Sequence, residues 1–153
     1  MKSIRRFTYA VVLFLSALNF APSLASAQDA ASAPDPAKGK QTFNQCLACH
    51  RIGPDAKALV GPPLTNVIGR KAGTFEGFSY SPLMKAAGEA GLVWSQDEIV
   101  AYLVNPSNYL KKYLTDHGKA DAATGSSKMV YMLANETQRK NVVAYVATFS
   151  TAK

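Results

Sequence analysis

The residues with the clearest chemistry are the two cysteines of the chain, Cys46 and Cys49, and the histidine that follows them, His50. They form the run Cys-Leu-Ala-Cys-His. On a helical turn, a spacing of three places two side chains on one face, roughly 5 to 6 Å apart at their Cβ atoms. Two sulfurs in that position can each reach one vinyl group of a haem, and His50, one turn beyond Cys46, then points at the iron. The run is the attachment signature of a c-type haem, so we predict one covalently bound haem c.

Two other interpretations of the cysteine pair compete with haem. A redox-active dithiol of the thioredoxin kind requires a βαβ background, but the flanking sequence has no strand pattern. A zinc site requires four ligands, and the chain offers one further histidine, His117, in a polar stretch that we expect to be an exposed loop. Both interpretations are weaker than haem attachment.

A haem that carries electrons without binding small molecules needs a second axial ligand, commonly methionine or histidine. Met84 lies in a short segment between Pro82 and Gly88, which predicts a short helix. Met129 and Met132 lie in a non-periodic segment before the last predicted helix. An irregular loop can lay a thioether across the haem, which favours this segment. Core packing is the commoner role of a methionine, and it fits Met84 and also Met132.

Residues 1–27 have the three parts of a secretory signal peptide. Basic residues near the start precede an apolar run over residues 9–15, and Ala25-Ser26-Ala27 closes the segment. We predict cleavage after Ala27 and a periplasmic location, with residues 28–36 as the N-terminal tail of the mature chain. An uncleaved membrane anchor is the alternative, although the apolar run is shorter than the ~20 residues of a spanning helix.

The remaining 126 residues have the size of one domain with one core, which we place at residues 37–150. They carry 14 basic and 10 acidic residues, a net charge of +4. This mild excess suits docking on acidic protein surfaces. The basic residues are spread along the chain without dense clusters, so we expect no nucleic-acid binding.

Beyond these signals, residues 37–149 resemble the class I cytochromes c, in particular the bacterial periplasmic members close to the mitochondrial protein. The agreement runs in order along the chain: Gly39, Phe43, Cys46 to His50, Gly61-Pro62-Pro63-Leu64, Ile68-Gly69-Arg70-Lys71-Ala72-Gly73, Gly77-Phe78-Ser79-Tyr80-Ser81, Trp94, Tyr102, Asn105-Pro106, Tyr109, Lys128-Met129 and Tyr145.

The resemblance implies that His50 and Met129 are the axial ligands of the iron. It implies that the Pro62 carbonyl accepts a hydrogen bond from the far ring nitrogen of His50, which would set the tautomer and orientation of the ring. It further implies that Tyr102 lies near the Met129 sulfur and that Ser127 is a polar neighbour in the same haem pocket.

Other residues acquire roles by the same resemblance. Arg70, Tyr80 and Trp94 resemble residues that donate hydrogen bonds to a buried haem propionate, whose charge is costly to desolvate. Gly39, Phe43 and Tyr145 resemble residues that pack the first helix against the last.

Local signals predict an all-α fold, with three main helices, short helices and long loops around the haem. Asp35 and Pro36 start a helix that runs into Cys46. A capping box over residues 95–98 starts a second, which ends before Asn105-Pro106. A third starts at Asn135, with apolar residues at helical spacing to Phe149. The segment between residues 109 and 129 is longer than in the mitochondrial pattern, and its path stays open.

We therefore expect a soluble, monomeric one-electron carrier and not an enzyme. By resemblance, its donor is a cytochrome bc complex or a dehydrogenase, and its acceptor is an oxidase, a reductase or a photosynthetic reaction centre. We expect lysines around the haem edge to steer acidic partners: Lys111, Lys112, Lys119 and Lys128. The alternatives are a membrane-tethered carrier and a small-molecule binder or peroxide-reducing enzyme with Met129 displaced.

Overall fold

The computed structural model describes residues 33–151, and the elements found within them are helical apart from one isolated bridge between Lys71 and Val93. The predicted signal segment, residues 1–27, lies outside the described residues. The elements are α1 (Pro36–Phe43), the 3-10 helix η1 (Cys46–Ala48), α2 (Pro82–Glu89), α3 (Gln96–Tyr102), α4 (Pro106–Asp116), the 3-10 helix η2 (Ala120–Ala122) and α5 (Glu136–Ala147). The predicted all-α class is confirmed.

The helix α1 starts as predicted but ends earlier. The Asp35 carboxylate accepts a hydrogen bond from the backbone N–H of Ala37 at 2.8 Å, and Pro36 is the first helical residue. The predicted continuation into Cys46 is wrong, because the backbone tightens after Phe43. Asn44 and Gln45 donate to carbonyls three residues back, a 3-10 pattern, and the chain then enters η1.

The predicted starts of two further helices are confirmed. The Ser95 hydroxyl accepts from the backbone N–H of Glu98 at 3.1 Å at the start of α3, which ends at Tyr102. The Asn135 side chain accepts from the backbone N–H of Gln138 at 2.9 Å at the start of α5. Phe149 lies just beyond the end of α5.

The helix α4 was not predicted. Asn105-Pro106 marks the end of the preceding helix, but the same two residues also start a new one: the Asn105 side chain caps the backbone N–H of Asn108 at 3.0 Å, and Pro106 is the first helical residue. Leu110 and Leu114 of α4 are fully buried, and α4 packs against α2. The predicted insert is thus helical as far as Asp116.

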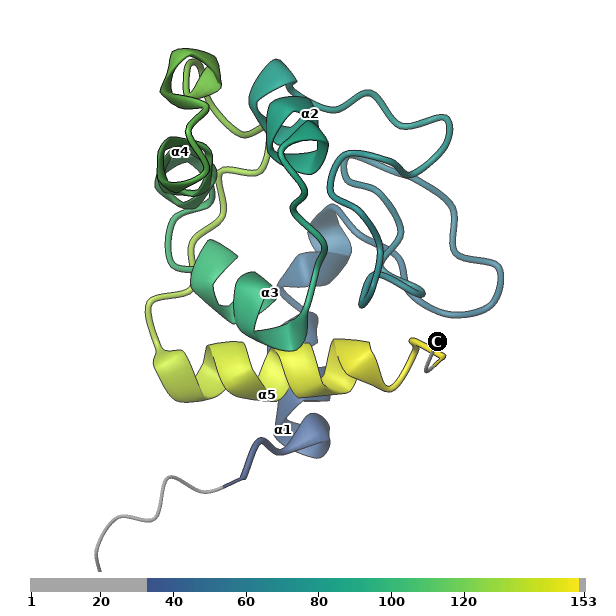
Figure 1. The fold of residues 1–153 in the computed structure, drawn as a ribbon. Coiled ribbons are helices and arrows are strands. Elements are labelled where there is room, and N and C mark those ends of the chain that lie inside the picture. The colour runs from purple at the N-terminus through teal and green to yellow at the C-terminus, as the bar shows by residue number, and fades with distance from the viewer. Residues whose placement is uncertain (1–32, 152–153) are drawn as a thin grey trace, which may run out of the picture. The chain divides into compact units, whose positions relative to one another are not determined.

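The first and last helices cross at close range. A Cβ on Gly39 of α1 would lie 2.9 Å from the Tyr145 Cβ of α5 and would overlap the Asn141 backbone. The rings of Phe43 and Tyr145 are 5.3 Å apart between centroids. The expected packing roles of Gly39, Phe43 and Tyr145 are confirmed. Figure 1 shows α5 with α1 crossing it on one side and α3 on the other, and long loops between α1 and α2.

Among residues 33–151, no helix combines the length and the apolar character needed to cross a bilayer.

Candidate haem site

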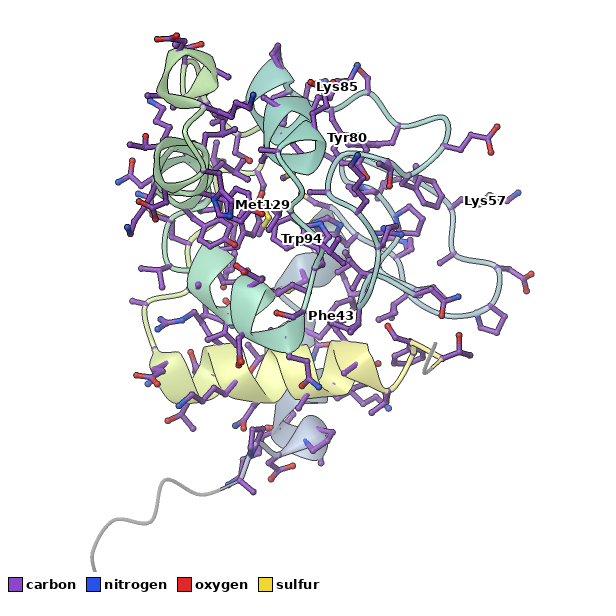
Figure 2. The ribbon with its side chains drawn as sticks, viewed as in Figure 1. Phe43, Lys57, Tyr80, Lys85, Trp94 and Met129 are labelled. Atoms are coloured by element: carbon purple, nitrogen blue, oxygen red, sulfur yellow. The ribbon has the colours of Figure 1, made fainter. Side chains whose placement is uncertain are left out.

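A cavity of about 350 Å³ lies inside the fold. Its wall is formed by η1, by the loops before α2 and α5, and by side chains of α2, α3 and α5. In Figure 2 Tyr80, Trp94 and Met129 lie toward the middle of the fold, whereas Lys57 points away from it. Every site residue that the sequence predicts lines this one cavity: Cys46, Cys49, His50, Pro62, Arg70, Tyr80, Trp94, Tyr102, Ser127 and Met129.

The two cysteines lie on one short turn at the cavity wall. The backbone N–H groups of Cys49 and His50 both donate to the Cys46 carbonyl, at 3.0 and 2.8 Å. Burial, with a smaller contribution from the neighbouring Cys49, raises the pKa of the Cys46 thiol to about 11. A redox-active dithiol needs a lowered thiol pKa, so this environment argues against the dithiol interpretation.

The ring of His50 is held by the loop that follows it. Its Nδ1 lies 2.7 Å from the Pro62 carbonyl oxygen, so the expected hydrogen bond is present. A proton on Nδ1 leaves Nε2 free to bind a metal. Burial lowers the pKa of His50, with the Pro62 hydrogen bond opposing and the Arg70 charge adding to that effect. The neutral imidazole, which is the metal-binding form, is therefore favoured.

Gly61 lets this loop approach the ring. A Cβ at Gly61 would lie 2.4 Å from His50 Cε1 and 2.7 Å from Nδ1, and would overlap the ring. Glycine is thus needed for a close approach of backbone to the ring, rather than for its backbone dihedral angles.

The loop that carries Met129 is tied to three other parts of the molecule. The Ser127 hydroxyl accepts from the Met129 backbone N–H at 3.1 Å and lies 3.0 Å from the Tyr102 hydroxyl of α3. The Ser127 backbone N–H donates to Ser107 of α4 at 3.0 Å. The Lys128 ammonium donates to the Ser79 carbonyl at 2.6 Å. These contacts fix the backbone that leads into Met129.

The core interpretation holds for Met84 but not for Met132. Met84 is 8% exposed, as a core residue should be, but it also lines the cavity. Met132 is 56% exposed, so its prediction as core filler is wrong. The extended segment after Met129 alternates its side chains, which leaves Met132 facing solvent while Leu133 is buried.

Arg70, Tyr80 and Trp94 contribute polar groups to an otherwise apolar wall. The Arg70 guanidinium donates to the Pro63 carbonyl at 3.0 Å, and burial lowers the pKa of Arg70. Burial raises the pKa of Tyr80, with the nearby Arg70 charge opposing. A half-buried cation near a phenol and an indole ring can receive an anionic group such as a propionate.

Sequence reasoning missed Arg139, which holds the far end of the loop that carries Met129. Arg139 is 9% exposed, and its guanidinium donates to the carbonyls of Leu133 and Ala134 at 2.8 and 2.6 Å. Helical spacing could have predicted that Arg139 is buried, because residue 139 shares the helical face of the buried Val142, Val143 and Val146.

The chemistry of the cavity fits a haem. A mostly apolar cavity of this volume with a few polar groups is typical of a cofactor pocket, and it holds two thiols on one turn, a neutral imidazole and a thioether. A zinc site fits less well, because no group of three or more histidine, cysteine or acidic side chains with metal-binding geometry occurs among the described residues.

The sequence model of the cytochrome c family matches residues 36–150, and the chain belongs to that family. It is a class I bacterial cytochrome c, an electron carrier with one covalently bound haem c and not an enzyme.

Within the family, the chain is similar to cytochromes c2. It is 60% identical over 116 residues to cytochrome c2 iso-1 of Rhodospirillum centenum, covering 76% of this chain and 97% of the relative. It is 62% identical over 114 residues to a cytochrome c2 of Rhodopseudomonas palustris, covering 74% and 97%. The solved cytochrome c2 from Rhodospirillum centenum matches with a TM-score of 0.76 and 57% identity, over 76% of this chain and 99% of that one. The comparisons do not support the tethered or the peroxide-reducing alternative.

Proposed function

We propose that this cytochrome is a soluble periplasmic carrier in which His50 and Met129 are the axial ligands and Cys46 and Cys49 the covalent attachments of the haem. The observation that carries the proposal is that Met129, distant in sequence from the Cys46–His50 run, lines the same cavity of about 350 Å³ as Cys46, Cys49 and His50. The haem, when bound, would supply an iron that takes up and gives up one electron by alternating between the ferric and ferrous states.

The surrounding residues hold the two ligands in place. Pro62 orients His50 through the 2.7 Å contact to Nδ1. Ser127 and Tyr102 position the Met129 backbone. Because a thioether ligand favours the ferrous state relative to a second histidine, a fixed Met129 keeps the potential high.

Arg70, Tyr80 and Trp94 are proposed to receive a haem propionate. The support is chemical: their polar groups lie at the wall of a mostly apolar cavity, where a carboxylate would otherwise be desolvated without a partner.

The periplasmic location rests on the first 27 residues. We propose that they are a signal peptide cleaved after Ala27, leaving residues 28–36 as a tail and residues 37–150 as the haem domain. N-terminal sequencing of the purified protein should read from Gln28. A chain that still begins at Met1 would favour the tethered alternative.

The proposed redox partners are a cytochrome bc complex or a dehydrogenase as donor, and an oxidase, a reductase or a reaction centre as acceptor. Of the four lysines expected at the haem edge, Lys128 lines the cavity. Lys111 and Lys112 lie on α4, and Lys119 lies just before η2. Lys128 is therefore the lysine best placed to act beside the haem.

The first experiment is the optical spectrum of the purified ferric and ferrous protein. We expect sharp c-type bands and, in the ferric state, the weak near-infrared band of an iron–methionine bond. Met129→Ala should abolish that band and let the ferrous protein bind carbon monoxide. Met132→Ala is the matched control and should change neither property. A Met129→Ala protein that keeps the band would overturn the ligand assignment.

A further inference from the structure

A chain of aromatic rings leads from the haem cavity to the outer end of α4. Trp94 and Tyr102 line the cavity. The Tyr109 ring lies 6.3 Å from that of Trp94 and 5.8 Å from that of Tyr102, between centroids. Tyr113 follows at 6.4 Å from Tyr109, and His117 stacks on Tyr113 at 4.0 Å with an interplanar angle of 18°. Haem attachment and ligation use none of the last three rings.

The exposure of the rings changes along this chain. Tyr102 is buried, Tyr109 and Tyr113 are partly buried, and His117 is exposed. The chain therefore joins the interior of the cavity to solvent, and consecutive rings lie at the separations of ordinary aromatic contacts.

Tyr109 has a partner suited to its oxidation. A phenol that loses one electron becomes strongly acidic, so its oxidation is easiest where a base can take the proton. The Tyr109 hydroxyl donates to the Glu98 carboxylate of α3. The Tyr102 hydroxyl instead meets the Ser127 hydroxyl, which is a poor base. Among the tyrosines of this aromatic series, Tyr109 is thus the one whose hydroxyl is hydrogen-bonded to a carboxylate.

We propose that these rings form a relay that lets the reduced protein quench strong one-electron oxidants, such as oxygen-centred radicals, at the surface formed by Tyr113 and His117. The proposal rests on the proposed function, because the electron comes from a haem in the cavity. The proposal adds radical quenching to electron transfer. It places the quenching at the surface formed by Tyr113 and His117, away from the haem cavity.

The steps of the relay balance. Tyr109 loses one electron through Tyr113 to the oxidant, its O–H bond breaks, and Glu98 takes the proton. A ferrous haem held in the cavity would then supply one electron to the Tyr109 radical past Trp94 and Tyr102, and Glu98 would return the proton. In sum, the oxidant would gain the one electron that the haem gives up. The direction follows because a tyrosyl radical is a far stronger oxidant than a ferric haem with histidine and methionine ligands.

The sequence provides a direct test, because the chain has two histidines. His50 lies in the cavity and is proposed to bind the iron, whereas His117 is exposed and has its Nδ1 2.7 Å from the Tyr113 carbonyl, leaving Nε2 for a label. A ruthenium polypyridyl complex bound to His117 in the holoprotein can be excited and oxidatively quenched by a flash. The measured quantity is the rate at which the ferrous haem band then disappears.

We expect Tyr109→Phe, which keeps the ring but removes the phenol, to slow this oxidation on the order of tenfold or more. Glu98→Gln should also slow it, and the wild-type rate should fall in heavy water because a proton moves. Tyr145→Phe is the matched control: it also removes one phenol, but Tyr145 packs where α1 crosses α5, outside both the relay and the cavity lining. Its rate should equal that of the wild type.

Equal rates for the wild type, Tyr109→Phe and Glu98→Gln would overturn the relay. Failure of the proposed function would look different, because a protein without a His50–Met129 haem would lack the ferrous band or the near-infrared band before any flash.

Discussion

At the scale of single residues, Ser127 links the parts of the cavity wall that decide where Met129 lies. It is 5% exposed, and its hydroxyl meets both the Tyr102 phenol and the Met129 backbone N–H. A buried hydroxyl with both partners satisfied holds its neighbours in one geometry, since leaving either unpaired costs about 1–3 kcal/mol. The ligand loop is therefore positioned by α3 as well as by its own sequence.

Tyr102 gives this network a pH dependence. Burial, opposed by the Ser127 hydrogen bond, raises the pKa of Tyr102 to about 12. In the unfolded chain the phenol ionises at about pH 10, so unfolding becomes easier above that pH. The stability contribution is full below about pH 10 and is lost as the pH rises towards the folded value of about 12.

We expect the unfolding free energy of the wild type to fall more between about pH 9 and 11 than that of Tyr102→Phe, which has no phenol to ionise. Denaturant titrations of both proteins at the two pH values measure the difference. Equal falls would show that Tyr102 is not the group responsible.

At the scale of elements, the crossing of α1 and α5 closes the fold beside the cavity. Gly39 allows the close approach, and the Asp35 backbone N–H donates to the Asn141 side chain of α5 at 2.8 Å. Phe43, at the end of α1, both packs against the Tyr145 ring and lines the cavity. The position of this cavity wall thus depends on how closely the two helices meet.

Gly39→Ala should destabilise the protein by about 1–3 kcal/mol or more. The new Cβ would overlap the Asn141 backbone, so the two helices would have to move apart. Lys40→Ala, an exposed change on the same helix, is the control and should stay within about 0.5 kcal/mol of the wild type. Chemical denaturation measures both. A Gly39→Ala protein as stable as Lys40→Ala would show that the helices can separate without loss.

At the scale of the whole molecule, the haem replaces a large part of the core. An empty cavity of about 350 Å³ would cost about 8 kcal/mol at roughly 24 cal/mol per Å³. Domains of this size are stable by only about 5–15 kcal/mol in total. The chain without haem is therefore close to its folding limit.

We expect the apoprotein, made in cells without haem-attachment machinery, to show little of the helical far-ultraviolet circular dichroism of the holoprotein. An apoprotein as helical as the holoprotein would contradict this expectation. It would mean that the side chains can fill the cavity, or that the fold tolerates it empty.

The net charge acts at the same scale. Residues 28–153, which the proposed cleavage would leave, carry a net charge of +4, and these charges are screened over ~10 Å at 0.1 M salt. We expect the association rate with an acidic redox partner to fall as salt is raised, as seen in stopped-flow mixing. An association rate that does not change with ionic strength would contradict the proposed steering by lysines.

Local sequence signals predicted the start of helices well but not what lies between them. Asp35, Ser95 and Asn135 cap helices because each bond is made within three residues. The helix α4 escaped because Asn105-Pro106 was interpreted as a stop alone, and its buried Leu110 and Leu114 pack against α2, which is distant in sequence. The exposure of Met132 likewise depends on the course of an extended loop.

The sequence by itself determined the haem attachment, the family and the all-α class, because these follow from short spacings and from ordered agreement along the chain. Only the tertiary structure decided that Met84 also lines the cavity while Met132 faces solvent, and that Arg139 holds the far end of the loop that carries Met129. It alone aligned Tyr109, Tyr113 and His117 with the cavity. Such contacts join different elements, and their geometry exists only once the helices pack.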